Sequence, residues 1–337
     1  MKLNLSQVKY FQEIFFLLMN KSNNMNILIT GGAGFLGANL ARSLIEEGHS
    51  VTSMDNFHSG RKENLISCED SSSFQSITHD IRKPLDMSGN IDQIYHLACP
   101  ASPKFYQADP IYTTETCVIG TLNVLNFALK KNAKILFTST SEVYGDPEVH
   151  PQPESYRGSV NSIGIRACYD EGKRCAESIF YDFHRMHGVD IKVARLFNTY
   201  GPLMRSDDGR VVSNFICQSI TDSPITLYGD GTQTRSFCHV DDLILGLKKL
   251  MQSDSSILYP VNLGNPGEFS LLELIKEIEN LANKPLRIKF FPLPMDDPRM
   301  RKPDIQIAKT KLDWEPSIQL RDGLISTYQY FSEQLKD

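Results

Sequence analysis

The sequence predicts an α/β protein with a doubly wound parallel sheet and a smaller α+β lobe toward the C-terminus. Short runs rich in β-branched residues alternate with stretches of helical length over the first part of the chain. A glycine-rich turn separates the first such run from the first helical stretch. Beyond about Phe197 the alternation weakens, and proline and glycine become frequent. Strands separated by helix-length connections are typical of parallel sheets covered on both faces.

The expected elements follow in the order that such a sheet requires. The first strand is expected at residues 26–30, and the next helix at 35–47, with an apolar face formed by Leu36, Leu40 and Leu44. Further strands are expected at residues 50–55, 74–78, 93–97, 135–140 and 191–196.

Three parts of the chain are expected. Residues 25–197 form the nucleotide-binding domain, with returning segments near 235–264, and residues 198–337 form mainly the substrate-binding lobe. Residues 1–24 form an N-terminal extension whose apolar run IFFLLM is only six residues long. A membrane span needs about 20 apolar residues, so we expect an amphipathic helix there. Alternatively, natural translation begins at Met25.

The composition narrows the classes of partner. With 35 basic and 40 acidic residues the formal charge is −5, which does not favour binding to nucleic acid or to an anionic membrane. The seven cysteines contain no C-x-x-C pair, so neither a disulfide framework nor a zinc site or other metal site is expected. Free thiols favour a reducing compartment, and we expect a cytoplasmic protein.

The glycine-rich turn predicts a dinucleotide-binding site of the Rossmann type. Gly31, Gly34 and Gly37 stand in a G-x-x-G-x-x-G spacing between the first strand and the first helix. Such glycines permit a tight turn, close backbone approach to a pyrophosphate and close helix packing. The phosphates would lie at the helix N-terminus, where free N–H groups favour anions.

An acidic residue at the end of the second strand indicates which dinucleotide binds. Asp55 follows the last glycine by 18 residues, where a carboxylate binds the adenosine ribose. A carboxylate repels a 2′-phosphate, so NAD is expected, although the nearby Arg61 and Lys62 leave NADP open. Asp80 after the third strand is either an adenine contact or a turn residue.

A Y-x-x-x-K pair predicts the catalytic residues. Tyr169 and Lys173 would share one face of a helix, and a neighbouring cation lowers the pKa of a tyrosine. The segment Ser139-Thr140-Ser141-Glu142 lies at the carboxyl end of an expected parallel strand, where ligands bind in such sheets. A hydroxyl, an acid and a Tyr/Lys pair would therefore converge on one ligand.

Six motifs together resemble a known family. GGAGFLG, STSEVYGDP, RACYDEGKR, RLFNTYGP, DGRVVSNF and RKPD are similar to those of extended short-chain dehydrogenases/reductases, specifically the UDP-glucuronate decarboxylases. The similarity extends from about Met25 to the C-terminus, without the membrane anchor that some animal members carry.

This resemblance implies a role for each matching residue. Tyr169 would remove the C4″ hydroxyl proton with help from Lys173, Thr140 would bond the C4″ oxygen, and Ser141 and Glu142 would orient the sugar. The implied cofactor contacts are Gly31, Gly34, Phe35, Leu36, Gly37, Asp55, Asn56, Phe57, Ser59, Gly60, Asp80, Ile81, Leu97, Cys99, Thr116, Tyr169, Lys173 and Thr199. The implied contacts to the UDP-sugar substrate are Asn198, Arg210, Val212, Asn214, Tyr228, Arg235 and Arg301.

The reaction implied is decarboxylation of UDP-glucuronate to UDP-xylose through a 4-keto sugar, with no net redox. Related dehydratases carry an Asp–Glu pair after the threonine, but here the first position is Ser141. Related epimerases usually lack the acid at Glu142. A 4-epimerase, an oxidative decarboxylase that releases the keto sugar, and a cofactor-sensing regulator without catalysis are the alternatives, although the complete catalytic set favours an enzyme.

Three residues of this chain differ from those usual in the family that it resembles. Glu115 stands where the family usually has Lys, which would favour the substrate carboxylate or diphosphate. Cys117 replaces a usual Asn and Cys99 a common Ser. The resemblance further implies a homodimer, in which the helix of Tyr169 and the helix from Thr116 to Lys130 pack against their symmetry mates.

Overall fold

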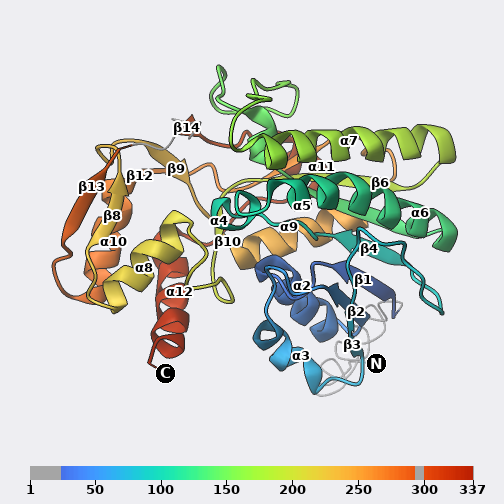
Figure 1. The fold of residues 1–337 in the computed structure, drawn as a ribbon, viewed down its shortest axis with the longest axis horizontal. Coiled ribbons are helices and arrows are strands. Elements are labelled where there is room, and N and C mark those ends of the chain that lie inside the picture. Colours follow the sequence, from blue (N-terminus) through green and yellow to red (C-terminus); the bar gives the residue numbers. More distant parts are fainter. Residues whose placement is uncertain (1–23, 293–299, 337) are drawn as a thin grey trace, which may run out of the picture.

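The computed structural model describes residues 24–292 and 300–336. The helix expected in the N-terminal extension lies outside the described residues. Within the described ranges, no helix combines the length and the apolar character that a membrane crossing requires. Figure 1 shows two lobes, one built on a sheet with helices on both faces and a smaller one with α8, α10 and α12.

The larger lobe contains a seven-stranded parallel sheet in the order β3-β2-β1-β4-β5-β6-β11. Its strands are β1 (Asn26–Thr30), β2 (Ser50–Asp55), β3 (Phe74–Thr78), β4 (Gln93–His96), β5 (Lys134–Thr140), β6 (Ile191–Leu196) and β11 (Val261–Leu263). The order reverses between β1 and β4, so a crevice for a ligand is expected at their carboxyl ends. The predicted fold class and the six predicted strands are confirmed.

Two apolar clusters cover the two faces of this sheet. On one face, Leu40 and Leu44 of α2 (Phe35–Glu46) pack with Leu243 of α9 (Val240–Gln252) and with α11 (Gln306–Leu312). On the other face, Val124 of α6 (Thr121–Lys131) and Phe180 of α7 (Ala167–His187) are buried. A π-turn, η2 (Thr116–Gly120), joins α6 to α5 (Pro110–Glu115), and α3 (Ile66–Glu69), α4 (Pro103–Tyr106) and two 3₁₀ turns, η1 (Lys62–Leu65) and η3 (Ser141–Tyr144), complete the lobe.

The smaller lobe has its own core. Phe215 of α8 (Val211–Ile220), Leu274 of α10 (Leu271–Ala282) and Leu324 of α12 (Leu320–Gln334) are buried together. Its strands are β8 (Ile225–Tyr228) paired with β13 (Ile288–Phe291), and a sheet of β9 (Thr234–Ser236), β12 (Glu268–Ser270) and β14 (Met300–Arg301).

The chain crosses between the lobes more than once. A short pair of strands, β7 (Thr199–Tyr200) and β10 (Cys238–His239), lies between them. After β10 the chain returns to the larger lobe through α9 and β11, and α11 returns there again after β14. Arg301 therefore lies close to the carboxyl end of β5, although 160 residues separate it from Ser141.

Candidate active site

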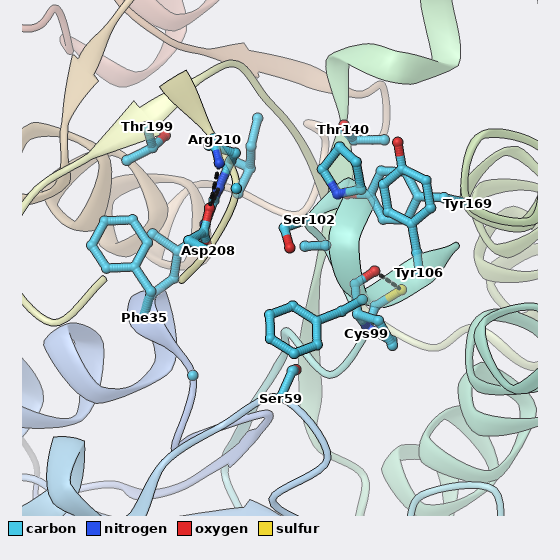
Figure 2. A pocket seen from close by; sticks show the side chains of 18 of the residues that line it. Phe35, Ser59, Cys99, Ser102, Tyr106, Thr140, Tyr169, Thr199, Asp208 and Arg210 are labelled. Carbon is cyan, nitrogen blue, oxygen red and sulfur yellow. Dashed lines mark hydrogen bonds and ion pairs between the residues drawn. The ribbon is translucent and has the colours of Figure 1, made fainter. Parts of the chain in front are cut away.

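One cavity of about 590 Å³ lies at the carboxyl ends of the parallel strands, between the two lobes. Its volume is in the range of small-molecule sites. Its wall contains every predicted catalytic, cofactor and substrate residue except Phe57. The Phe57 side chain packs instead with a small cluster around Leu65, and its backbone N–H donates to Asp55. Figure 2 shows side chains of both lobes facing this cavity, including Tyr169 and Arg210.

The glycine turn leaves no room for side chains. Gly31 has φ +74°, and a Cβ there would stand 2.7 Å from the backbone nitrogen of Ala98. A Cβ on Gly37 would stand 2.2 Å from the Gly31 carbonyl oxygen. Gly34 is the N-cap of α2, so the first N–H groups of this helix face the cavity side of the turn. A cradle that any Cβ would fill, at a helix N-terminus, fits a dinucleotide pyrophosphate.

Asp55, the predicted ribose contact, is hydrogen-bonded to the glycine-rich turn. Its carboxylate accepts hydrogen bonds from the backbone N–H of Ala33 at 3.0 Å and of Phe57 at 2.8 Å. Burial raises the pKa of Asp55, and these backbone bonds oppose the rise. Arg61 and Lys62 do not line the cavity: Arg61 donates to Tyr330, and Lys62 lies over the Phe57 ring. Arg61 and Lys62, which could have bound the 2′-phosphate of NADP, thus lie outside the cavity wall. The residues that line the cavity fit NAD.

Glu115 belongs to an ion-pair cluster next to Asp80. Arg82 donates to Asp80 at 2.8 Å and to Glu115 at 2.6 Å, and its guanidinium lies 4.1 Å from the ring centroid of Tyr112. The Arg82 hydrogen bond lowers the pKa of Asp80. Glu115 is not in the cavity wall, whereas Asp80 and Tyr112 are. Glu115 therefore pairs with Arg82 outside the cavity wall, which favours the alternative that it makes no contact with the sugar carboxylate or diphosphate.

The long helix α7 carries Tyr169 and Lys173 to the end of β5. Glu177 fixes this helix to the sheet, since its carboxylate accepts from Ser139 on β5 at 2.5 Å and from Arg195 on β6 at 2.7 Å. Lys173 is buried and donates to the carbonyl of Thr138 at 2.8 Å. The sequence places these residues correctly because positions four apart share a helix face.

The electrostatics of Tyr169 differ from the prediction. Burial raises the pKa of Tyr169 well above its usual value, and a hydrogen bond with Thr140 opposes this only in part. The Lys173 ammonium lies 5.9 Å from the tyrosine ring centroid and is already bonded to Thr138. The expected net lowering of the Tyr169 pKa by Lys173 is therefore wrong, because burial sets the direction of the shift.

Glu142 is the ionised acid of the site. Its carboxylate pairs with Arg166 at 2.7 Å and with Arg301 at 3.2 Å. Burial alone would raise the pKa of Glu142, but Arg301, Arg166 and Arg235 lower it by more, so the net shift is downward. Arg301 also donates to the carbonyl of Ser141 at 2.6 Å. Glu142 and Arg301, which the resemblance assigned to the substrate, therefore form one charged cluster with Arg166 beside Tyr169.

The smaller lobe supplies the far wall of the cavity. Arg210 forms an ion pair with Asp208 at 2.5 Å and lies 5.9 Å from the Phe35 ring centroid (Figure 2). The Thr199 hydroxyl donates to the carbonyl of Phe197, and this bond fixes the Thr199 side chain at the boundary between the lobes. The other residues of this wall predicted to bind substrate are Asn198, Val212, Asn214, Tyr228 and Arg235.

Three residues of the cavity wall are candidate functional residues that the sequence reasoning missed. Arg166 lies one helical turn before Tyr169 within RACYDEGKR, and that spacing could have assigned it to the site. Tyr106 stacks on Tyr169 with ring centroids 5.0 Å apart, and no sequence signal predicts this contact. The hydroxyls of Tyr106 and Ser102 are buried in the cavity wall without a hydrogen-bond partner among the described residues, as expected of groups that bind a polar ligand.

These features define a nucleotide-binding protein with a Tyr/Lys pair and an acid at the carboxyl ends of a parallel sheet. The NAD dependent epimerase/dehydratase family matches residues 27–264, and the chain belongs to this family. Within it, the chain is 54% identical over 303 residues to UDP-glucuronic acid decarboxylase 5 of Arabidopsis thaliana, covering 90% of this chain and 88% of the relative. It is 50% identical to UDP-glucuronic acid decarboxylase 1 of Danio rerio, over 99% of this chain and 79% of the relative.

The fold is also similar to solved structures of family members. A UDP-glucuronic acid 4-epimerase from Bacillus cereus, in complex with UDP-glucuronic acid and NAD, superposes with a TM-score of 0.84. It is 29% identical and is matched over 92% of this chain and all of its own. A UDP-glucose 4-epimerase from Thermotoga maritima, with UDP-glucose, has a TM-score of 0.83 at 28% identity, over 92% of this chain and all of that one.

Proposed function

We propose that this protein is a UDP-glucuronate decarboxylase that uses NAD to convert UDP-glucuronate to UDP-xylose without net redox. The observation that carries this proposal is Glu142, held ionised by two arginines beside Tyr169 in the cavity. The high identity to decarboxylases over nearly the whole chain supports the same substrate. Epimerase structures share the fold at much lower identity.

The residues of the larger lobe hold the cofactor. The glycine turn and the α2 N-terminus would receive the pyrophosphate, Asp55 would bind the ribose, and Asp80 would contact the adenine; all of these groups line the cavity. When bound, NAD takes up the two electrons removed at C4″ and returns them after CO₂ has left. Because no net oxidation occurs, the same cofactor serves every cycle.

Tyr169 and Thr140 handle the proton of the C4″ hydroxyl. The Tyr169 phenol must first lose its own proton, which the positive charges of Lys173 and of a bound nicotinamide ring would favour. The phenolate would then take the C4″ proton, with Thr140 bonded beside it. Oxidation there would give a ketone β to the C6″ carboxylate, and such an acid loses CO₂ because the electrons of the C5″–C6″ bond flow into an enolate. The enolate would then take up a proton at C5″ before hydride returns to C4″. Thr140 and Tyr169 can donate to that oxygen, which stabilises the negative charge.

Glu142 and the two arginines paired with it act on the carboxylate of the sugar. Arg301 and Arg166 attract the sugar carboxylate, while Glu142 keeps their summed charge from holding it too tightly. A carboxylate bound by strong cations resists decarboxylation, since its charge must move into the ring. Glu142 therefore favours the step that distinguishes a decarboxylase from an epimerase.

Product analysis tests this assignment. The purified protein is incubated with UDP-glucuronate and NAD, and the nucleotide sugars are identified by NMR. We expect a UDP-pentose with the configuration of xylose. UDP-galacturonate would instead indicate a 4-epimerase, and an unchanged substrate would indicate a protein without catalysis.

We further infer that the protein works as a cytoplasmic homodimer. In support, Ile119, Leu122 and Leu129 are exposed on η2 and α6, which pack against α7 at one side of the molecule (Figure 1). All seven cysteines are free thiols, as suits a reducing compartment. Light scattering tests the dimer: a dimeric mass is expected, and Leu122→Glu should lower it to that of a monomer. A monomeric wild type at micromolar concentration would contradict it.

A further inference from the structure

Two cysteines contact each other under the catalytic residues. Cys99 and Cys117 have their Sγ atoms 3.3 Å apart. Cys99 follows β4 and lines the cavity (Figure 2), whereas Cys117 lies in η2 and is buried. We propose that this pair is an oxidation site: a hydroperoxide converts it to a disulfide, and the disulfide stops turnover.

The geometry is close to that of a disulfide. The bond requires the sulfurs to approach to about 2.05 Å, a movement of little more than about 1 Å. Cys99 and Cys117 are 18 positions apart in sequence, on a strand end and a helix that both belong to the larger lobe, so no domain movement is needed. Within the described residues, the Cys99–Cys117 pair is the sulfur–sulfur hydrogen-bonding contact, whereas Cys175 is exposed on α7.

The environment makes Cys99 the nucleophile. Burial raises the pKa of its thiol, but the hydrogen bond from Cys117 and the charge of Lys173 lower it by more, so the net shift is downward. The same hydrogen bond raises the pKa of Cys117, which therefore keeps its proton. A cavity-facing thiol whose pKa is lowered, next to a second thiol 3.3 Å away, is the arrangement in which oxidation is favoured and is resolved as a disulfide.

The chemistry balances with a hydroperoxide as the oxidant. The Cys99 thiolate attacks one peroxide oxygen, the O–O bond breaks, and a sulfenic acid and hydroxide form. The Cys117 thiol then attacks the Cys99 sulfur, the S–S bond forms, and water leaves with the thiol proton. For hydrogen peroxide, two thiols lose two electrons and two water molecules result.

The disulfide would act on catalysis through α7. A Cβ built on Gly172 would stand 3.1 Å from the Cys117 sulfur, so this sulfur packs directly against the helix segment between Tyr169 and Lys173. Drawing Cys117 toward Cys99 removes that support and also removes the thiolate from the cavity wall. We therefore expect the oxidised protein to lose at least about tenfold in kcat, since small displacements of catalytic groups are costly.

Thiol counting and mass spectrometry test the proposal. The purified protein is treated with hydrogen peroxide in slight molar excess, and thiols are then titrated after denaturation. We expect two of the seven thiols to disappear, the intact mass to fall by about 2 Da, and one cross-linked peptide pair to contain Cys99 and Cys117. Dithiothreitol should restore both the thiols and the activity.

Two variants make the result specific. Cys117→Ser should form no such cross-link, and its Cys99 should accumulate as a sulfenic acid that dimedone traps. Cys175→Ser, altered on the exposed side of α7, should form the cross-link as the wild type does. The proposal is overturned if the wild type yields no peptide pair joining Cys99 to Cys117. It is equally overturned if the cross-linked protein keeps full activity.

Discussion

Arg301 binds two consecutive residues at the end of β5: it donates to the Ser141 carbonyl at 2.6 Å and to the Glu142 carboxylate at 3.2 Å. The guanidinium comes from the smaller lobe, whereas its partners lie in the larger one. Arg301 is almost fully buried, so its charge depends on Glu142 for compensation. Glu142 is thereby held in place by a residue of the smaller lobe, to which we assign the sugar nucleotide.

Glu142→Gln should slow decarboxylation while leaving substrate binding intact or tighter. The variant leaves Arg166 and Arg301 without their counter-charge, so the sugar carboxylate is bound more strongly in the ground state. We expect a fall in kcat of about a hundredfold with an unchanged or lower KM, because tighter binding of the ground state raises the barrier to the chemical step. Release of CO₂ at several substrate concentrations measures both constants. A raised KM with unchanged kcat would show that Glu142 only binds substrate.

Ser141→Asp should not create a dehydratase. The new carboxyl would stand beside Glu142 in a pocket whose arginines are already engaged, and no second acid–base pair for water elimination would arise. The variant is assayed with a UDP-hexose for 4-keto-6-deoxy sugar by NMR. Formation of that product, by the variant or by the wild type, would contradict our interpretation of this segment.

Tyr169→Phe should abolish turnover but not NAD binding. Loss of a positioned base costs about 10²–10⁴-fold, whereas the phenylalanine ring can keep the stacking on Tyr106. Activity and NAD affinity are measured separately. Tyr181→Phe is the matched control, since Tyr181 lies on the same helix but outside the cavity wall. A Tyr169→Phe variant with more than about a tenth of wild-type activity would reject the assignment.

Glu115→Lys should weaken NAD binding and leave the KM for UDP-glucuronate unchanged. The new cation would repel Arg82 and loosen its hold on Asp80, the proposed adenine contact. Exposed ion pairs contribute at most about 1 kcal/mol, so the NAD dissociation constant should rise only a few-fold. Isothermal titration at low and high salt measures it, and high salt should reduce the difference. A lower KM for UDP-glucuronate would place Glu115 at the sugar instead.

Asp170 should make the stability of the protein pH-dependent. Burial raises the pKa of Asp170 to about 7, and nearby Glu142 adds to this. One of its carboxyl oxygens is buried and has no hydrogen-bond partner in the part of the chain that the structure describes. An acid with a raised folded-state pKa holds its proton after the unfolded chain has lost it. Stability from this group is therefore greatest below about pH 4 and decreases as the pH rises to about 7.

Urea unfolding at pH 4.5 and pH 8 tests this effect. Asp170→Asn, which cannot ionise, should be more stable than the wild type at pH 8 and close to it at pH 4.5. Asp86→Asn, at an exposed carboxyl in the larger lobe, is the control and should change little at either pH. Equal stability of the wild type and Asp170→Asn at pH 8 would contradict a raised pKa of Asp170 in the folded protein.

The sequence predicted the sheet and most of the cavity because both depend on local patterns. Alternating β-branched runs define the strands, and the spacing of Gly31, Gly34 and Gly37 defines a turn. The partners of Glu142 and Glu115 could not be predicted in this way. Arg301 and Arg82 reach them across long sequence separations that depend on how the lobes and loops pack. The pKa of Tyr169 also depends on burial, which helical spacing alone does not reveal.

The most direct test of the central claim follows the hydrogen at C4″. UDP-glucuronate with deuterium at C4″ is converted in the presence of NAD, while absorbance reports any NADH released. Because the electrons removed at C4″ return to the same carbon, the UDP-xylose formed should retain its deuterium there and no NADH should accumulate. Loss of the deuterium from C4″, or NADH released in step with CO₂, would contradict a decarboxylase without net redox.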